Sequence, residues 1–145
     1  MMDPEVLRKL TEELIPFNKF MGVRATHVGP GVIRIELPWK SELVGNPVKP
    51  AMHGGVISMM ADTAGGLAAW GALEGQNAHV STVDLRIDYM RPGKLETLVA
   101  EANVLRQGKT LIVTDIRLFH PSNEAELIAV GRGVYAVKHA KASTR

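Results

Sequence analysis

The sequence predicts an α+β fold in which an antiparallel sheet of about six strands wraps around one long helix. Three observations predict it. Residues 54–73 form an apolar run with a single charged side chain, Asp62. Four stretches of strand character follow residue 77, and the links between them are too short for crossover helices, which favours antiparallel pairing. A helical segment and a pair of strands precede the apolar run.

The chain opens with an amphipathic pattern over residues 3–16. Asp3 can cap a helix there, Pro4 suits its first position and Pro16 is expected to end it. The apolar side chains that recur at helical spacing, and are expected to share one face, are Val6, Leu7, Leu10 and Leu14.

Two strands and a long loop are expected next. Residues 21–28 and 31–39 flank a Gly-Pro-Gly turn and have the pattern of a strand pair. The loop over residues 40–52 contains Pro47 and Pro50, and stiff loops of this length commonly shape a binding site.

The apolar run at residues 54–73 is long enough to cross a membrane. Asp62 near its centre, five glycines and the lack of basic flanks argue against that reading, because a carboxylate in mid-membrane is costly. A helix that is apolar on every face also suits the buried centre of a soluble domain. We therefore expect the rest of the chain to cover it.

The four strands after residue 77 are expected at 79–90, 96–106, 110–119 and 127–137, as an antiparallel meander. The whole chain, 1–145, fits one domain, with an N-terminal helical segment at 1–19 and a frayed tail at 139–145. Alternation in the first strand divides its side chains between two faces, Val83, Leu85, Ile87 and Tyr89 on one, and Asp84, Arg86 and Asp88 on the other.

Composition excludes several classes of function. Seventeen basic and fifteen acidic residues leave a net charge of +2, too little for a protein that neutralises many phosphates of a nucleic acid. There is no cysteine for disulfides or metal sites, and the five histidines have no metal-ligand spacing, so no metal is expected. The N-terminus lacks the pattern of a signal peptide, so we expect a cytoplasmic protein without nucleic-acid or membrane partners.

A short motif opens the apolar run: His53, Gly54 and Gly55 come first, and Asp62 and Thr63 follow. With the element order, this motif resembles the hotdog fold, and in particular the PaaI-like acyl-CoA thioesterases. The resemblance covers about residues 20–137, and "DLRIDYMRP" and "VLRQGK" fit it as well. It implies hydrolysis of a small-molecule acyl- or aryl-acyl-CoA to the free acid and CoA, no cofactor beyond the CoA of the substrate, and a homodimer or dimer of dimers.

Thioester hydrolysis needs hydrogen-bond donors for the carbonyl oxygen and a nucleophile or base. Gly54 and Gly55 fall where the first turn of the helix has unpaired N–H groups, and Asp62 supplies the carboxylate. Eight helical steps place Gly54 and Asp62 about 12 Å apart along the axis, so they cannot act on one thioester unless two subunits share a site. The alternatives are a structural role for Asp62, through a backbone or hydroxyl partner, and a packing role for Gly54.

Other candidates support this pair. His53 either orients substrate or holds the loop. The resemblance implies that an asparagine before the histidine orients water, but Asn46 is one residue further from His53 than the pattern expects. A hydroxyl of Thr82, or of Ser81, is expected to position water or Asp62. The candidates for binding the CoA phosphates are Arg91, Arg106 and Lys109. The other substrate-binding candidates are Gly55, Ser81 and Gly108. The candidates for an acyl pocket, or alternatively for ordinary core or dimer packing, are Met52, Met59, Met60 and Trp70.

Two rival functions stay open. A hydroxyacyl dehydratase on the same fold would use His53 as its base. A non-catalytic acyl-CoA sensor would normally carry a DNA-binding segment, for which the 19 residues before Phe20 are too few. The sequence does not choose between direct attack by Asp62 and activation of water.

Overall fold

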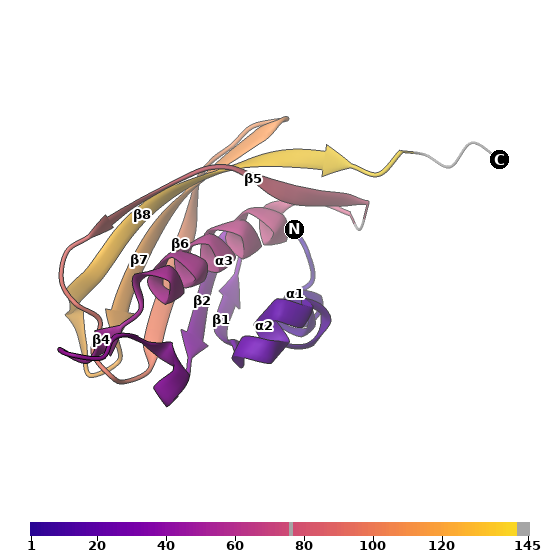
Figure 1. The fold of residues 1–145 in the computed structure, drawn as a ribbon. Helices are drawn as coiled ribbons and strands as arrows, with labels where there is room; N and C mark the ends of the chain where they lie inside the picture. The colour runs from indigo at the N-terminus through magenta and orange to yellow at the C-terminus, as the bar shows by residue number, and fades with distance from the viewer. Residues whose placement is uncertain (76, 142–145) are drawn as a thin grey trace.

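The computed structural model describes residues 1–75 and 77–141. A six-stranded antiparallel sheet curves around the long helix α3 (Gly54–Ala72), which lies along the concave face (Figure 1). The predicted α+β architecture is confirmed. From edge to edge the strands are β1 (Arg24–Gly29), β2 (Val32–Leu37), β6 (Leu98–Gln107), β7 (Leu111–His120), β8 (Asn123–His139) and β5 (Ala78–Tyr89).

The position of β5 differs from the expected meander. Strands β6, β7 and β8 do form a meander, but β5 pairs with β8, from Ala78 opposite His139 to Tyr89 opposite Ala129. Eight residues separate Tyr89 from Leu98, enough chain to pass the ends of β8 and β7 before β6 begins. As a result, β5 is an edge strand of twelve residues with one open side.

A bulge also changes the expected faces of β5. The register shifts between Thr82 and Asp84, which makes Val83 the extra residue, and its side chain is 59% exposed. Leu85 and Ile87 pack against the core as expected. The grouping of Val83 with these inward residues is therefore wrong.

Helix α3 can be largely apolar because other parts of the chain cover it on two sides. Its side chains Met60, Ala61 and Ala64 are fully buried in the core with residues of the sheet. On another side Leu7 of the N-terminal segment approaches so closely that a Cβ at Gly71 would lie 2.5 Å from it. Within the described residues, no helix combines the length and the apolar character needed to cross a membrane.

The N-terminal segment contains α1 (Pro4–Lys9), a π-helical turn (Leu10–Leu14) and α2 (Pro16–Met21). Asp3 caps α1 as predicted, but Pro16 begins α2 rather than ending the helical segment, which runs two residues past the expected boundary. The expected apolar face is wrong too, since Val6 and Leu14 are exposed while Leu7 and Thr11 are buried. A π turn adds residues to the turn and so rotates the buried face.

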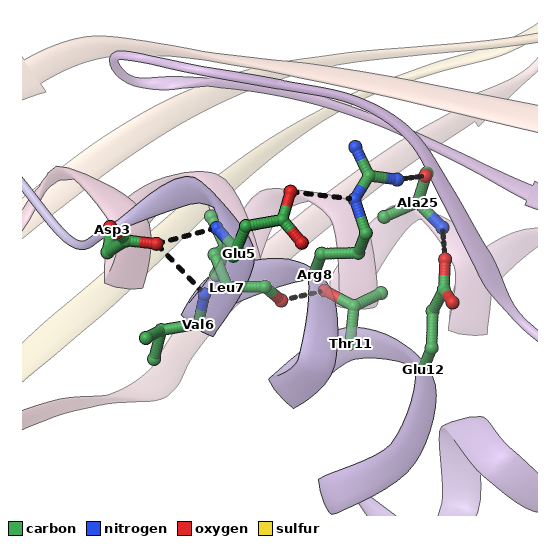
Figure 2. Close-up of polar contacts among 8 residues, drawn as sticks. All are labelled: Asp3, Glu5, Val6, Leu7, Arg8, Thr11, Glu12 and Ala25. Atoms are coloured by element: carbon green, nitrogen blue, oxygen red, sulfur yellow. Dashed lines mark hydrogen bonds and ion pairs between the residues drawn. The ribbon is translucent and has the colours of Figure 1, made fainter.

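Polar contacts fasten this segment to β1 (Figure 2). The side chain of Arg8 donates to the carbonyl of Ala25, and the N–H of Ala25 donates to Glu12 Oε1 at 2.8 Å. Thr11 donates to the carbonyl of Leu7 at 2.7 Å inside the segment. Both backbone groups of Ala25 are thus satisfied by the helical segment, which fixes its position beside the sheet.

The loop at 40–52 positions the start of α3. It contains a 3₁₀ turn (Ser41–Leu43) and a small hairpin of β3 (Val44–Asn46) and β4 (Ala51–Met52). The N–H of His53 donates to the carbonyl of Leu43 at 2.8 Å. At the other end of the chain β8 extends to His139, and residues 142–145 of the expected frayed tail lie outside the described residues.

Candidate active site

His53 is the N-cap of α3. Its Nδ1 accepts a hydrogen bond from the N–H of Gly55 at 2.8 Å. A Cβ at Gly55 would lie 2.8 Å from that same Nδ1, so a side chain there would displace the cap. In this chain His53 holds the helix start, and Gly55 is needed to let it do so.

Gly54 is the first residue of α3, and its amide is available. No acceptor for its N–H occurs in the part of the chain that the structure describes. Gly54 is outside the left-handed region, and a Cβ there would meet only Tyr89 Cε1, at 3.7 Å. Nothing in the chain itself therefore requires glycine at 54. The exposed amide at the positive end of a helix is suited to an oxygen that gains negative charge.

Asp62 lies half-buried in the middle of α3, with one carboxylate oxygen fixed. Oδ1 accepts hydrogen bonds from the Thr82 hydroxyl at 3.0 Å and from the Tyr135 hydroxyl at 3.3 Å. Tyr135 also contacts the Asp62 carbonyl at 3.2 Å. Among the described residues nothing donates to Oδ2, so this oxygen is available to a substrate or a water molecule.

Tyr135 is a site residue that the sequence analysis missed. Its side chain is fully buried, and burial, together with the nearby charge of Asp62, raises the pKa of its phenol. The phenol therefore stays protonated and acts as a donor at physiological pH. Gly133 makes room for it, since a Cβ there would lie 2.5 Å from the ring; a glycine two residues before a strand tyrosine is the only sequence signal we can identify.

A cavity of about 260 Å³ opens in front of Asp62 between α3, β5, β8 and the N-terminal segment. Of the four acyl-pocket candidates only Trp70 lines it, while Met60 and Met52 are buried in the core and Met59 packs against it. The core reading is the correct one for these three methionines. The lining residues are Ile15, Phe17, Asn18, Asp62, Thr63, Gly66, Leu67, Trp70, Val80, Thr82 and Tyr135.

Two predicted site residues, Asn46 and Ser81, do not contact the Asp62 carboxylate. The side-chain oxygen of Asn46 accepts from the N–H groups of Val48 at 3.0 Å and Lys49 at 3.1 Å, which closes a turn in its own loop. Ser81 neighbours Thr82 in β5, so its side chain points to the opposite face of the sheet from Asp62. Neither side chain contacts Asp62 or Gly54 within this chain.

The basic candidates for CoA phosphates do not converge within one chain. Arg106 and Lys109 are at the β6–β7 hairpin, near the end of β8 where Ala136 pairs with Leu111. Arg91 follows β5 at the opposite end of β8, where its side chain donates to the carbonyl of Leu127. A Cβ at Gly108 would lie 2.9 Å from the Leu111 carbonyl, so the hairpin itself requires this glycine.

The curved sheet around one long helix is the hotdog architecture, and an exposed amide at the helix start with an acid at mid-helix suits the hydrolysis of an activated acyl compound. Residues 50–126 match the family described as the Thioesterase superfamily, and the chain belongs to this family. The predicted fold family and enzyme class, thioester hydrolase, are thereby confirmed.

Relatives with similarity along most of the chain agree with this assignment. The human protein named acyl-coenzyme A thioesterase 13 is 32% identical over 130 residues, which are 88% of this chain and 89% of that protein. The Escherichia coli protein named medium/long-chain acyl-CoA thioesterase YigI is 30% identical over 136 residues, 85% of this chain and 86% of that one. A solved thioesterase-superfamily structure from Shewanella oneidensis superposes with a TM-score of 0.83 at 25% identity, covering 93% of this chain and 95% of that one.

Proposed function

We propose that the protein hydrolyses acyl-CoA thioesters to a free acid and CoA, without a cofactor, at two equivalent sites shared between the chains of a homodimer. The names of the human and Escherichia coli relatives support acyl-CoA as the substrate class. The arrangement of the candidate residues around β5 supports the shared site.

The observation that carries this proposal is the way β5 links the two halves of the site. At one end of the strand Thr82 bonds Asp62, and at the other end the Tyr89 hydroxyl donates to the carbonyl of Gly54 at 3.2 Å. The outer side of β5 is open, and an open edge of this length is a template for pairing with another strand. If two copies pair antiparallel through β5, the Tyr89 end of one lies beside the Thr82 end of the other. Gly54 of each chain then comes close to Asp62 of its neighbour.

The proposed reaction uses these groups directly. The Gly54 N–H of one chain donates to the thioester oxygen and stabilises the negative charge of the tetrahedral intermediate. Asp62 Oδ2 of the other chain removes a proton from water as water attacks the carbonyl carbon; alternatively, it attacks that carbon itself, and water then hydrolyses the mixed anhydride. In both routes the carbon–sulfur bond breaks, and the CoA thiolate leaves and takes up a proton.

The same pairing addresses the separation of the basic residues. Antiparallel β5 strands place Arg91 of one chain near the β6–β7 hairpin of the other, which carries Arg106 and Lys109. Three cations then lie at the mouth of each site, where CoA phosphates are expected.

The test is hydrolysis of a panel of acyl-CoA thioesters by the wild type and by Asp62→Asn, with folding checked by circular dichroism. We expect turnover by the wild type and its loss in the variant; equal turnover would reject the role of Asp62.

Mixed dimers test whether the site is shared. Asp62→Asn and Gly54→Pro chains are each expected to be inactive alone. Refolded together in equal amounts, they should recover about a quarter of wild-type activity, because half of the dimers are mixed and each mixed dimer has one intact site. No recovery would contradict a site that combines Gly54 of one chain with Asp62 of the other.

A further inference from the structure

We infer that Trp70 limits the length of the acyl chain that the enzyme accepts, and that the chain lies along α3 between Asp62 and this indole. The inference deepens the proposed function and rests on it. It starts from two open pockets that lie between the N-terminal segment and α3.

The first cavity, of about 260 Å³, contains Asp62. The second, of about 410 Å³, opens to solvent beside the N-terminal segment and is lined by Met1, Met2, Asp3, Val6, Leu10, Leu14, Trp70 and Gly75. Among residues 1–75 and 77–141, Trp70 is the one that lines both. The indole therefore stands between a cavity at the reacting carboxylate and a second, mainly apolar one.

The path from Asp62 to Trp70 follows one face of α3. Residues 62, 66 and 70 are four apart, so they lie in a row on the helix surface. Gly66 leaves this row open: a Cβ there would be 3.4 Å from the Tyr135 ring, a contact that needs little adjustment, so packing within the chain does not strictly demand glycine. The absence of a side chain keeps space between the carboxylate and the indole.

The Trp70 ring is held in place. The indole Nε1 donates to the carbonyl of Ala78 at 2.9 Å. The His79 ring lies next to the indole, with 6.4 Å between the ring centroids. The opposite wall is also fixed, because Arg8 and Glu12 tie the N-terminal segment to Ala25 (Figure 2). A fixed indole between fixed walls makes a size limit rather than an adaptable surface.

The geometry gives a chain length. Trp70 follows Asp62 by eight helical steps, about 12 Å along the axis of α3. An extended polypeptide advances about 3.6 Å per residue over three backbone bonds, which is about 1.2 Å per bond. We apply the same advance per bond to an extended acyl chain. A saturated acyl chain of roughly ten carbons therefore reaches Trp70, whereas a butanoyl chain advances only about 4 Å and ends short of Gly66, which lies about 6 Å along the axis.

The experiment compares kcat/KM for butanoyl-, octanoyl-, decanoyl- and hexadecanoyl-CoA in the wild type and three variants. The wild type should lose efficiency beyond decanoyl-CoA. Trp70→Ala should raise the hexadecanoyl to octanoyl ratio about tenfold, and Gly66→Ala should lower the decanoyl to butanoyl ratio by about the same factor. His79→Ala is the matched control, because His79 contacts the indole but lines neither cavity, and its ratios should equal those of the wild type.

Binding of a fatty acid can be measured independently of thioester hydrolysis, through the fluorescence of Trp70. The chain has two tryptophans, so Trp39→Phe leaves Trp70 as the sole indole, and dodecanoic acid should shift its emission. Hydrolysis with unchanged ratios in Trp70→Ala and Gly66→Ala, or an unchanged emission, would overturn the inference. A wild type that cleaves no acyl-CoA but shows the emission shift would instead overturn the proposed function. If Trp70→Ala does not fold, the Gly66→Ala ratios and the emission decide.

Discussion

Two substitutions at Gly54 distinguish the effect of losing its N–H from the effect of adding a side chain next to it. Gly54→Pro removes the N–H and little else, because proline suits the first position of a helix and this N–H has no acceptor within the described part of the chain. The residue before it, His53, has φ −59° and ψ 130°, the extended conformation that a following proline favours. Gly54→Ala keeps the N–H and adds a methyl group whose nearest neighbour is Tyr89 Cε1 at 3.7 Å.

In Gly54→Pro, stability and activity should therefore change in opposite directions. Each variant loses chain entropy in the unfolded state, so its free energy of unfolding should rise by about 0.5 kcal/mol. Loss of one oxyanion donor costs about a hundredfold or more in kcat, and Gly54→Pro should show that loss. The assays are urea unfolding and acyl-CoA hydrolysis on the same preparations. A stable Gly54→Pro protein with wild-type kcat would refute the role of this amide.

Three further predictions concern the acid and its partners. Asp62→Asn should lower kcat about a hundredfold or more, measured with folding verified by circular dichroism; a fall confined to KM would contradict its role as base or nucleophile. Thr82→Val should lower kcat while Thr82→Ser retains most of it, because only the hydroxyl reaches Oδ1 at 3.0 Å; equal losses in both would point to packing instead. Burial raises the pKa of Tyr135, so its contribution to stability is complete below pH about 10 and is lost as the pH rises further. Thermal unfolding across that range should show a steeper loss for the wild type than for Tyr135→Phe, and parallel curves would show that this phenol does not titrate on unfolding.

The fold was predictable where its signals are local. The apolar run gave the central helix to within a residue, and Asp3 with Pro4 gave the start of α1. The neighbour of β5 was not predictable, because pairing with β8 depends on contacts between residues as distant as Ala78 and His139. The π turn was missed as well, since no residue pattern marks the point where the buried face rotates.

The site shows the same division. The motif at His53 and the hydroxyl at Thr82 could be recognised in the sequence, and the structure places Thr82 on Asp62. Tyr135 is 73 residues from Asp62 in sequence, and only the fold brings the two together. Asn46 shows the reverse case: its sequence position suggested a role, whereas its side-chain oxygen is engaged in its own loop.

One continuous helix, α3, carries both the Gly54 amide and the Asp62 carboxylate. In the proposed symmetric dimer its first turn would serve one reaction centre and its middle would serve the other. A small shift of one α3 helix along the other would change the distance between the Gly54 amide and the Asp62 carboxylate equally at both centres. The geometry of the two centres would therefore change together.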